Sequence, residues 1–315
     1  MHIHARALLY FDAIRCDGSI RGAARRLFVD ASAVNRQLIQ LEQEVGFPLF
    51  ERLSNGLKLT PAGELFARHT THVLQDQQWL ANELDMLRGV QRGEVHVVGV
   101  EAVYNDLLPE VVAEMLGQFP GVRMQASLAG SADIAAFVTD ARADVGVAFN
   151  AGATSGVTRV AGGEFQIGAI VAADHPLARS PRVNLERCAE WPLLLGSADL
   201  AAYALVEAEI SALPSAPCVA LRSASIELMK RLAASGHGIA FQTRLGLARP
   251  ESGAQGFAFV PLIDSAGNPV VSDLGVYVRT GRTLPPAVTA FVDCLADVMA
   301  RHADCGGLVA TSAPG

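Results

Sequence analysis

Amide, hydroxyl and guanidinium side chains gather in a short stretch near the N-terminus, at spacings that suit contacts with nucleic acid. Asn35, Arg36 and Gln40 share one side of any helix that includes them. Side-chain amides form paired hydrogen bonds with adenine, and arginine does so with guanine or with phosphate. The chemistry indicated is readout of base edges in a major groove. The residues expected at those edges are Ala31, Ser32, Asn35, Arg36 and Gln40.

Basic side chains flank this stretch on both sides. Arg21 and Arg25 lie one helical turn apart upstream, and Arg52 and Lys58 lie downstream. Such cations bind phosphates and fix the position of a protein on a duplex without reading its sequence. A solvated surface is the alternative for any one of these arginines, but their combination favours a DNA interface.

Three helices and a hairpin are needed to hold these side chains on one surface. Apolar residues recur at helical spacing through residues 4–46, and Ser19 and Asp30 stand where N-caps of the second and third helices belong. Asn55-Gly56, a strong turn signal, joins short strands at 49–53 and 57–59. This order predicts a winged helix-turn-helix. Its inward-facing residues would be Ala23, Ala24, Leu27, Phe28, Val34, Leu38, Leu41 and Val45.

A long helix is predicted from Pro61 to about residue 88, with Thr60 as its cap. Apolar residues recur along it every seven residues, the spacing of a coiled-coil seam. Packing within its own domain is the alternative; we favour a second copy of the chain as the partner. The predicted dimerisation residues are Phe66, Val73, Leu80, Leu84 and Leu87.

From residue 93 onward, strand-sized apolar runs alternate with helical stretches, which predicts βαβ units and a mostly parallel sheet. The fold class is therefore α/β with an all-α N-terminal part, and residues 303–315 are expected to form a flexible tail. Strands are expected at 95–100, 123–128, 144–149, 168–172, 193–195, 219–222, 239–241, 257–261 and 274–278, and helices at 107–119, 134–140, 201–212, 226–235 and 286–302.

Composition narrows the class of protein. Of 315 residues, 50% are hydrophobic and 18% charged, which excludes a disordered chain. Residues 1–92 hold 11 Lys and Arg against 10 Asp and Glu, whereas residues 93–315 hold 14 against 22, so any DNA contact must be local to the N-terminal part. No apolar signal core opens the chain, so we expect a cytoplasmic protein. The 5 cysteines are widely spaced and fit neither a disulfide framework nor a zinc site.

Motifs for catalysis are weak. The sequence holds no Gly-x-Ser-x-Gly elbow, no P-loop and no His-Glu-x-x-His. Gly236-His237-Gly238 precedes a predicted strand, so it is a poor dinucleotide fingerprint, and His69 and His72 have no third ligand in view. We expect no catalytic residue, cofactor or metal. A solute-binding protein and an α/β enzyme, both built on residues 93–302, remain the alternatives, and salt-sensitive retention of a specific DNA would exclude them.

Combined, these features resemble the LysR-type transcriptional regulators. Stretches at 143–147 (ADVGV), 175–178 (HPLA) and 233–240 (AASGHGIA) are similar to parts of that family's effector domain. The N-terminal part of the resemblance is carried by Phe11, Ser19, Ala23-Ala24, Leu27, Val34, Leu41-Glu42, Gly46, Leu49-Phe50, Arg52 and Leu59-Thr60-Pro61-Ala62-Gly63.

The resemblance implies an organisation and a function. It implies a winged helix-turn-helix over 1–60 (helix-turn-helix 19–38), a dimerisation helix over 61–92 and a two-lobed effector domain like a periplasmic binding protein over 93–302. Lobe one would be 93–163 with 268–302, and lobe two 164–267. The protein would bind an interrupted inverted repeat as a homo-oligomer and respond to a small molecule, with RNA polymerase as a further partner.

The resemblance also places the ligand where strand ends and helix N-termini of both lobes face one cleft. Family members often carry Ser or Thr just after the first strand, where this chain has Glu101. A carboxylate there would repel an anionic effector and attract a cationic or hydroxyl-rich one, with Arg244 as its partner in the empty cleft. Exposure of Glu101 to solvent is the alternative. The predicted effector residues are Glu101, Ala102, Ser131, Ser197, Ser223, Thr243 and Arg244.

Overall fold

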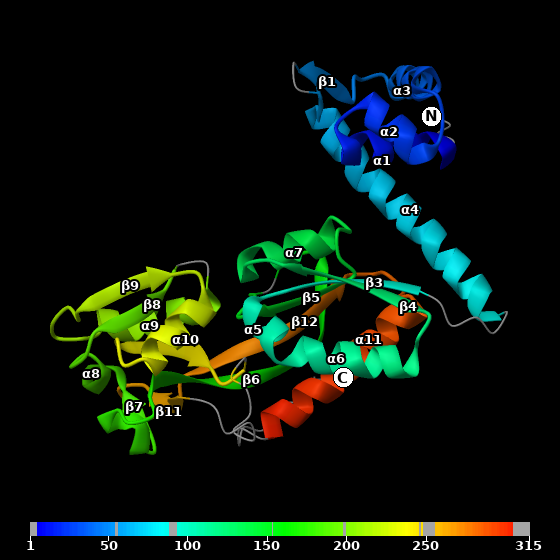
Figure 1. Cartoon of the computed structure of the whole chain (residues 1–315). Coiled ribbons are helices and arrows are strands. Elements are labelled where there is room, and N and C mark those ends of the chain that lie inside the picture. Colours follow the sequence, from blue (N-terminus) through cyan, green and yellow to red (C-terminus); the bar gives the residue numbers. More distant parts are fainter. Residues whose placement is uncertain are drawn as a thin grey trace. The chain divides into compact units, whose positions relative to one another are not determined.

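The computed structural model describes residues 5–53, 56–87, 93–152, 154–197, 200–245, 247 and 256–304. The chain divides into an N-terminal unit, residues 1–88, and a C-terminal unit that holds most of the remainder (Figure 1). The predicted turn residues Ser54 and Asn55 and most of the predicted flexible tail lie outside the described residues.

The N-terminal unit has the predicted order of elements. Ser19 caps the second helix, because its Oγ accepts the N–H of Gly22 at 3.0 Å. Asp30 occupies the N-cap position of the third helix, but its side chain makes no capping hydrogen bond. The elements are α1 (Ala5–Asp17), α2 (Ile20–Leu27), α3 (Ala31–Val45), β1 (Phe50–Leu53), β2 (Gly56–Leu59) and α4 (Pro61–Leu87).

Phe28 corrects the predicted core of this unit. Its side chain is 95% exposed rather than buried. Helix α2 ends at Leu27, and Phe28 adopts a left-handed conformation with φ 53°. That turn takes the side chain out of the apolar stripe of α2, which a pattern based on helical spacing alone does not anticipate. The ring of Phe11 fills the centre instead, 5.1 Å from Phe50 and 4.8 Å from Phe66 between ring centroids.

The start of α4 is held against the hairpin. The hydroxyl of Thr60 donates to the carbonyl oxygen of Pro48 at 2.7 Å and accepts the N–H of Gly63 at 3.0 Å. A Cβ on Gly63 would overlap the carbonyl oxygen of Leu49. The helix backbone therefore packs directly on the chain that leads into the hairpin, and only glycine fits there.

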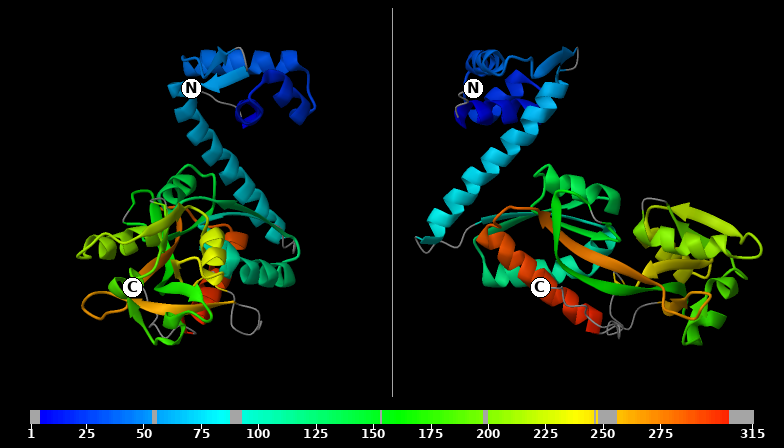
Figure 2. Two further views of the ribbon diagram at one scale, coloured as in Figure 1. Left: turned by 60° about the vertical axis from the view of Figure 1, so that its left-hand side comes forward. Right: turned by 180° about the vertical axis from the view of Figure 1, so that it is seen from behind.

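In the C-terminal unit, helices cover both faces of the sheet in lobe one. Val97 joins the apolar cluster under α6 and α11, and Val98, pointing the other way, joins the cluster under α7. The long strand β6 continues from this lobe into the second one (Figure 2). The elements are β3 (Gly93–Gly99), α5 (Glu101–Asn105), α6 (Leu107–Gln118), β4 (Val122–Leu128), α7 (Ser131–Thr139), β5 (Val145–Phe149), β6 (Val157–Ala172), β12 (Val271–Arg279) and α11 (Pro286–Asp304).

Lobe two is built on the second half of β6. This strand pairs with β12 as far as Gln166 and with β10 from Ile167 onward, so the change of partners lies a few residues beyond the predicted boundary at 163. The elements are η1 (Pro176–Arg179), β7 (Val183–Asn184), α8 (Leu185–Cys188), β8 (Leu193–Gly196), α9 (Ala201–Ser211), β9 (Val219–Ser223), α10 (Ile226–Ala234), β10 (Ile239–Thr243) and β11 (Phe257–Ile263).

The ten-stranded sheet is mixed, with the order β4-β3-β5-β12-β6-β10-β8-β9; β11 branches from β6, and β7 pairs with β11. The runs β4-β3-β5 and β10-β8-β9 are parallel, as predicted, whereas β6 and β12 pair antiparallel with their neighbours. The described helices include none that is long and apolar enough to cross a membrane.

A charged cluster fastens α11 to α6 in lobe one. The imidazole of His302, whose side chain is 7% exposed, has Nε2 2.9 Å from Glu110 Oε1 and Nδ1 3.5 Å from Asp106 Oδ2. The bonds with Asp106 and Glu110 raise the pKa of His302 above its usual value, although burial opposes them. Below this raised value, the protonated imidazole pairs with both carboxylates.

Because the pKa of His302 is raised in the folded state, its pairing stabilises the protein fully below the unfolded value, about 6.5, and is lost as the pH rises through the folded value. We expect His302→Gln to lower the Tm more at about pH 5.5 than at about pH 8.5, by about 2–4 °C for each kcal/mol lost. Thermal denaturation of both proteins at both pH values measures this. An equal loss of Tm at the two pH values would exclude the charged pairing.

Candidate DNA interface and ligand cleft

Helix α3 divides into a buried and an outward side as predicted. Val34, Leu38 and Leu41 are buried in the core of the N-terminal unit. On the other side, the side chains of Ser32, Arg36 and Gln40 are exposed, while those of Ala31 and Asn35 are half-buried. The predicted base-reading residues therefore lie on the outward side of one helix.

The hairpin is fixed to this helix by side-chain contacts. Nη2 of Arg52, on β1, donates to Oδ1 of Asn35 at 3.4 Å. The carboxylate of Glu42 accepts the N–H of Leu49 at 2.7 Å and the N–H of Phe50 at 3.2 Å. These contacts orient the wing and the amide of Asn35 relative to each other.

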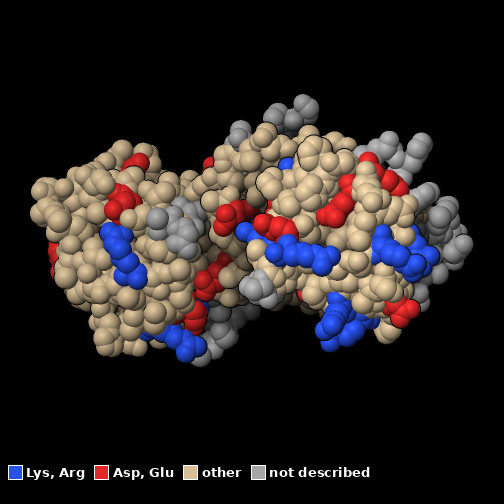
Figure 3. All heavy atoms as spheres, turned by 90° about the horizontal axis from the view of Figure 1, so that it is seen from above, with Lys and Arg blue, Asp and Glu red and all other residues tan. Residues whose placement is uncertain are grey.

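The predicted phosphate-binding residues Arg21, Arg25, Arg52 and Lys58 are all exposed. Figure 3 shows Lys and Arg as separate patches, with Asp and Glu among them, rather than as one continuous basic surface. Sequence reasoning missed a hollow between α2 and α3. The only signal for it is the run Leu27-Phe28-Val29, which holds more apolar residues than one stripe can bury. The hollow is lined by Arg21, Ala24, Arg25, Phe28, Val29, Asp30 and Ala31.

The predicted dimerisation stripe of α4 changes character along the helix. Phe66 is 7% exposed and packs edge-on against Phe11, so it belongs to the core of its own unit, which corrects its assignment to the seam. Val73 is half-buried against the same core, and Leu80 is 52% exposed. The side chains of Leu84 and Leu87 lie outside the described residues.

A cavity of about 220 Å³ lies in the C-terminal unit between the two lobes. It opens at the carboxyl ends of β3, β4 and β8 and at the starts of α5, α7 and α10, as expected for an α/β protein. Its walls are mostly apolar. The lining residues are Val100, Glu101, Ala102, Leu128, Ala129, Gly130, Ser131, Phe149, Leu195, Gly196, Leu200, Tyr203, Val206, Ala224, Ile226, Met229, Phe241, Gln242 and Thr243.

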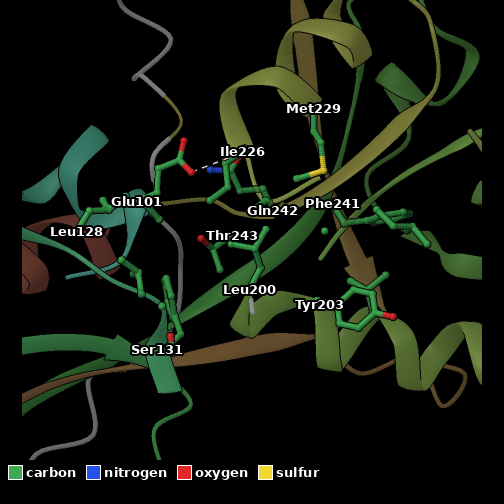
Figure 4. A pocket seen from close by; sticks show the side chains of 18 of the residues that line it. Glu101, Leu128, Ser131, Leu200, Tyr203, Ile226, Met229, Phe241, Gln242 and Thr243 are labelled. Atoms are coloured by element: carbon green, nitrogen blue, oxygen red, sulfur yellow. Dashed lines mark hydrogen bonds between the residues drawn. The ribbon is translucent and has the colours of Figure 1, made fainter. Parts of the chain in front are cut away.

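Glu101 connects the two lobes across this cleft. Its Oε2 accepts the backbone N–H of Ile226, the first residue of α10, at 3.4 Å (Figure 4). The guanidinium of Arg244 lies over the ring of Phe259, 5.7 Å from its centroid. Among the described residues, the expected pair between Arg244 and Glu101 is therefore replaced by this backbone contact.

Of the predicted effector residues, Glu101, Ala102, Ser131 and Thr243 line the cavity, whereas Ser197, Ser223 and Arg244 do not. The Oγ of Ser223 accepts the N–H of Ser225 at 3.0 Å, so it serves the loop before α10. Sequence reasoning missed the apolar walls from α9 and α10. No local signal marks them, because which side of each helix faces the cleft depends on how the lobes fold.

Comparisons with known proteins agree with both parts of the structure. The family model described as "Bacterial regulatory helix-turn-helix protein, lysR family" matches residues 5–64. The model described as "LysR substrate binding domain" matches residues 88–300, which is more than half of the chain.

Relatives and solved structures match along almost the whole chain. The regulator CbbR of Rhodospirillum rubrum is 24% identical, over 92% of this chain and 94% of its own. The RuBisCO operon transcriptional regulator of Allochromatium vinosum is 25% identical, over 96% and 98%. A full-length OxyR variant from Pseudomonas aeruginosa shares the fold, with a TM-score of 0.76, 18% identity and full coverage of both chains. Full-length CbnR in complex with its target DNA has a TM-score of 0.64 and 18% identity, over 94% of this chain and all of its own.

With a helix-turn-helix in one unit, a cavity between two lobes in the other and both family models matched in order, this chain belongs to the LysR family of DNA-binding transcriptional regulators.

Proposed function

We propose that this regulator acts in the cytoplasm as a homo-oligomer on an interrupted inverted repeat. Two copies joined through α4 carry two winged units, and a two-fold symmetric protein matches a two-fold symmetric site. On such promoter DNA, RNA polymerase is the further partner that we propose. The protein needs no cofactor, metal or catalytic residue for this role.

The observation that carries the proposal is the cavity between the lobes, across which the side chain of Glu101 contacts the start of α10. A small molecule bound there changes the contact between the lobes and so favours one arrangement of them. A ligand with different affinity for two arrangements shifts their populations, and this shift reaches the DNA-binding units without any reaction.

The two alternatives from the sequence, a solute-binding protein and an α/β enzyme, account for the C-terminal unit alone. Neither gives a role to the outward side of α3 or to the match of residues 5–64 with a regulatory helix-turn-helix. We therefore propose neither for this chain.

Single substitutions on the N-terminal unit test the DNA-binding part. We expect Asn35→Ala and Arg36→Ala each to weaken binding to the operator by about 1–3 kcal/mol while hardly changing binding to random DNA, as for base-edge contacts. Lys58→Ala should weaken binding to all sequences and reduce the slope of log affinity against log salt by about one unit. Fluorescence anisotropy with both DNAs over a salt series measures these effects. Equal losses on both DNAs in Asn35→Ala would show that α3 does not read bases.

A further inference from the structure

We infer that the cleft accepts a small apolar molecule with one protonated amine, and that its ammonium group binds beside Glu101. The inference rests on the proposed function, because it names the class of effector for the cleft described above. Three features carry it: the acceptors that line the cavity, the donors already in use around it, and the apolar walls.

The polar side chains in the cavity offer several hydrogen-bond acceptors, beside the hydroxyl groups of Ser131 and Tyr203, which can also donate. The hydroxyl of Thr243 gives its hydrogen to the carbonyl oxygen of Leu245 at 3.3 Å, so a lone pair remains for a ligand. Oε1 of Gln242, a side chain 5% exposed, and Oγ of Ser131 have no hydrogen-bond partner among the described residues. Oε2 of Glu101 holds Ile226, and Oε1 makes no hydrogen bond within the described part of the chain. A buried acceptor left without a donor is costly, so this set favours a ligand that donates.

Donors at the start of α10 and at the end of β8 are already in use. At the start of α10, the N–H of Ile226 binds Glu101, and the N–H of Leu228 binds Oγ of Ser225 at 3.3 Å. At the end of β8, the N–H of Ser197 binds the carbonyl oxygen of Ser223 at 3.0 Å. The described lining residues include no Lys, Arg or His. An anionic ligand at the start of α10 would have to displace the carboxylate of Glu101 and then lie next to it.

The remaining walls of the cavity are apolar, so we expect the rest of the ligand to be apolar. Leu195, Val206, Met229 and Phe241 line the cavity and are buried. A cavity of about 220 Å³ is small for a ligand site, so a molecule of fewer than about ten carbon atoms is the expected occupant. An ammonium group on an apolar molecule would donate to the carboxylate of Glu101 inside the cleft. Without a ligand, water would have to hydrate that carboxylate. Because Glu101 also holds α10, binding at this carboxylate acts directly on the contact between the lobes.

Isothermal titration calorimetry on the full-length protein at about pH 7 tests the inference, with hexylamine, hexanol and hexanoate as probes. A second series of 2-phenylethylamine, 2-phenylethanol and phenylacetate repeats the comparison on a different apolar body. We expect each amine to bind at least about tenfold more tightly than its alcohol, and the carboxylates not to bind measurably.

Three variants locate the binding. Glu101→Gln should lower the affinity for the amine at least about tenfold, to that of the alcohol. The matched control Glu94→Gln removes a charge from the outer end of β3, where the carboxylate is 50% exposed, and should leave the affinity unchanged. Ala224→Trp, at an exposed lining residue, should fill the cleft and abolish binding of every probe.

The inference is overturned if a carboxylate binds most tightly, if neither amine binds, or if Glu101→Gln or Ala224→Trp keeps the wild-type affinity for the amine. Retention of promoter DNA by the same wild-type preparation reports on the proposed function separately. Specific retention together with any of these results overturns the ligand class alone, whereas loss of specific retention overturns the proposed regulator.

Discussion

Leu80→Asp is expected to convert the protein to monomers and to reduce its affinity for a two-half-site operator to that of one winged unit. Leu80 lies on α4, is 52% exposed and belongs to the stripe that recurs every seven residues. In a dimer its side chain would be covered by the partner helix, and an unpaired carboxylate buried there costs about 3 kcal/mol or more in each copy. Multi-angle light scattering measures the mass.

The matched control is Leu65→Asp, the same substitution on the same helix outside that stripe, where Leu65 is 64% exposed. It should leave the mass of the oligomer unchanged. Circular dichroism must show both variants folded. An unchanged mass for folded Leu80→Asp would mean that the second half of α4 does not form the contact between copies.

Gly63→Ala should destabilise the N-terminal unit by about 1–3 kcal/mol and weaken DNA binding, because its Cβ would overlap the carbonyl oxygen of Leu49. The helix backbone fixes the position of this Cβ, and the carbonyl belongs to the backbone too, so the overlap is relieved only by moving α4 away from the hairpin. Thermal unfolding followed by circular dichroism measures the loss, and anisotropy with operator DNA measures the binding.

Gly117→Ala makes the same chemical change and is expected to raise the stability of the protein rather than lower it. Gly117 lies within α6, and a Cβ there meets nothing within 4 Å. Alanine is a better helix former than glycine, so this variant should be more stable by about 0.5–1 kcal/mol. If Gly63→Ala were as stable as the wild type, the close approach of α4 to Leu49 would be wrong.

The N-terminal unit was predictable because its signals are local. The caps at Ser19 and Thr60 form hydrogen bonds with residues three positions away, and the helical spacing of Val34, Leu38 and Leu41 identifies the buried side of α3 without knowledge of the rest of the chain. The alternation of strands and helices likewise identified the class of the C-terminal unit.

Features that depend on contacts distant in sequence were missed. Phe66 fits a coiled-coil stripe, but it packs against Phe11, 55 positions earlier in the sequence. Strand β6 begins at Val157 rather than at 168. The sequence did not indicate its first half, because this half contains glycines and charged residues that are unlike a buried strand. Pairing with β12 holds this half in the sheet. The partner of Glu101 is a backbone N–H at Ile226, which no pattern of side chains reveals.

The central claim is that two winged units of one oligomer read two half-sites of DNA. Hydroxyl-radical footprinting of the wild-type protein on the DNA upstream of its own gene tests this most directly. We predict two protected segments on one face of the duplex, separated by about 10 base pairs or a multiple of that distance. Protection should weaken with added salt and persist in an excess of unrelated DNA. The account would be contradicted by uniform protection that unrelated competitor DNA removes as readily as competitor DNA of the same sequence.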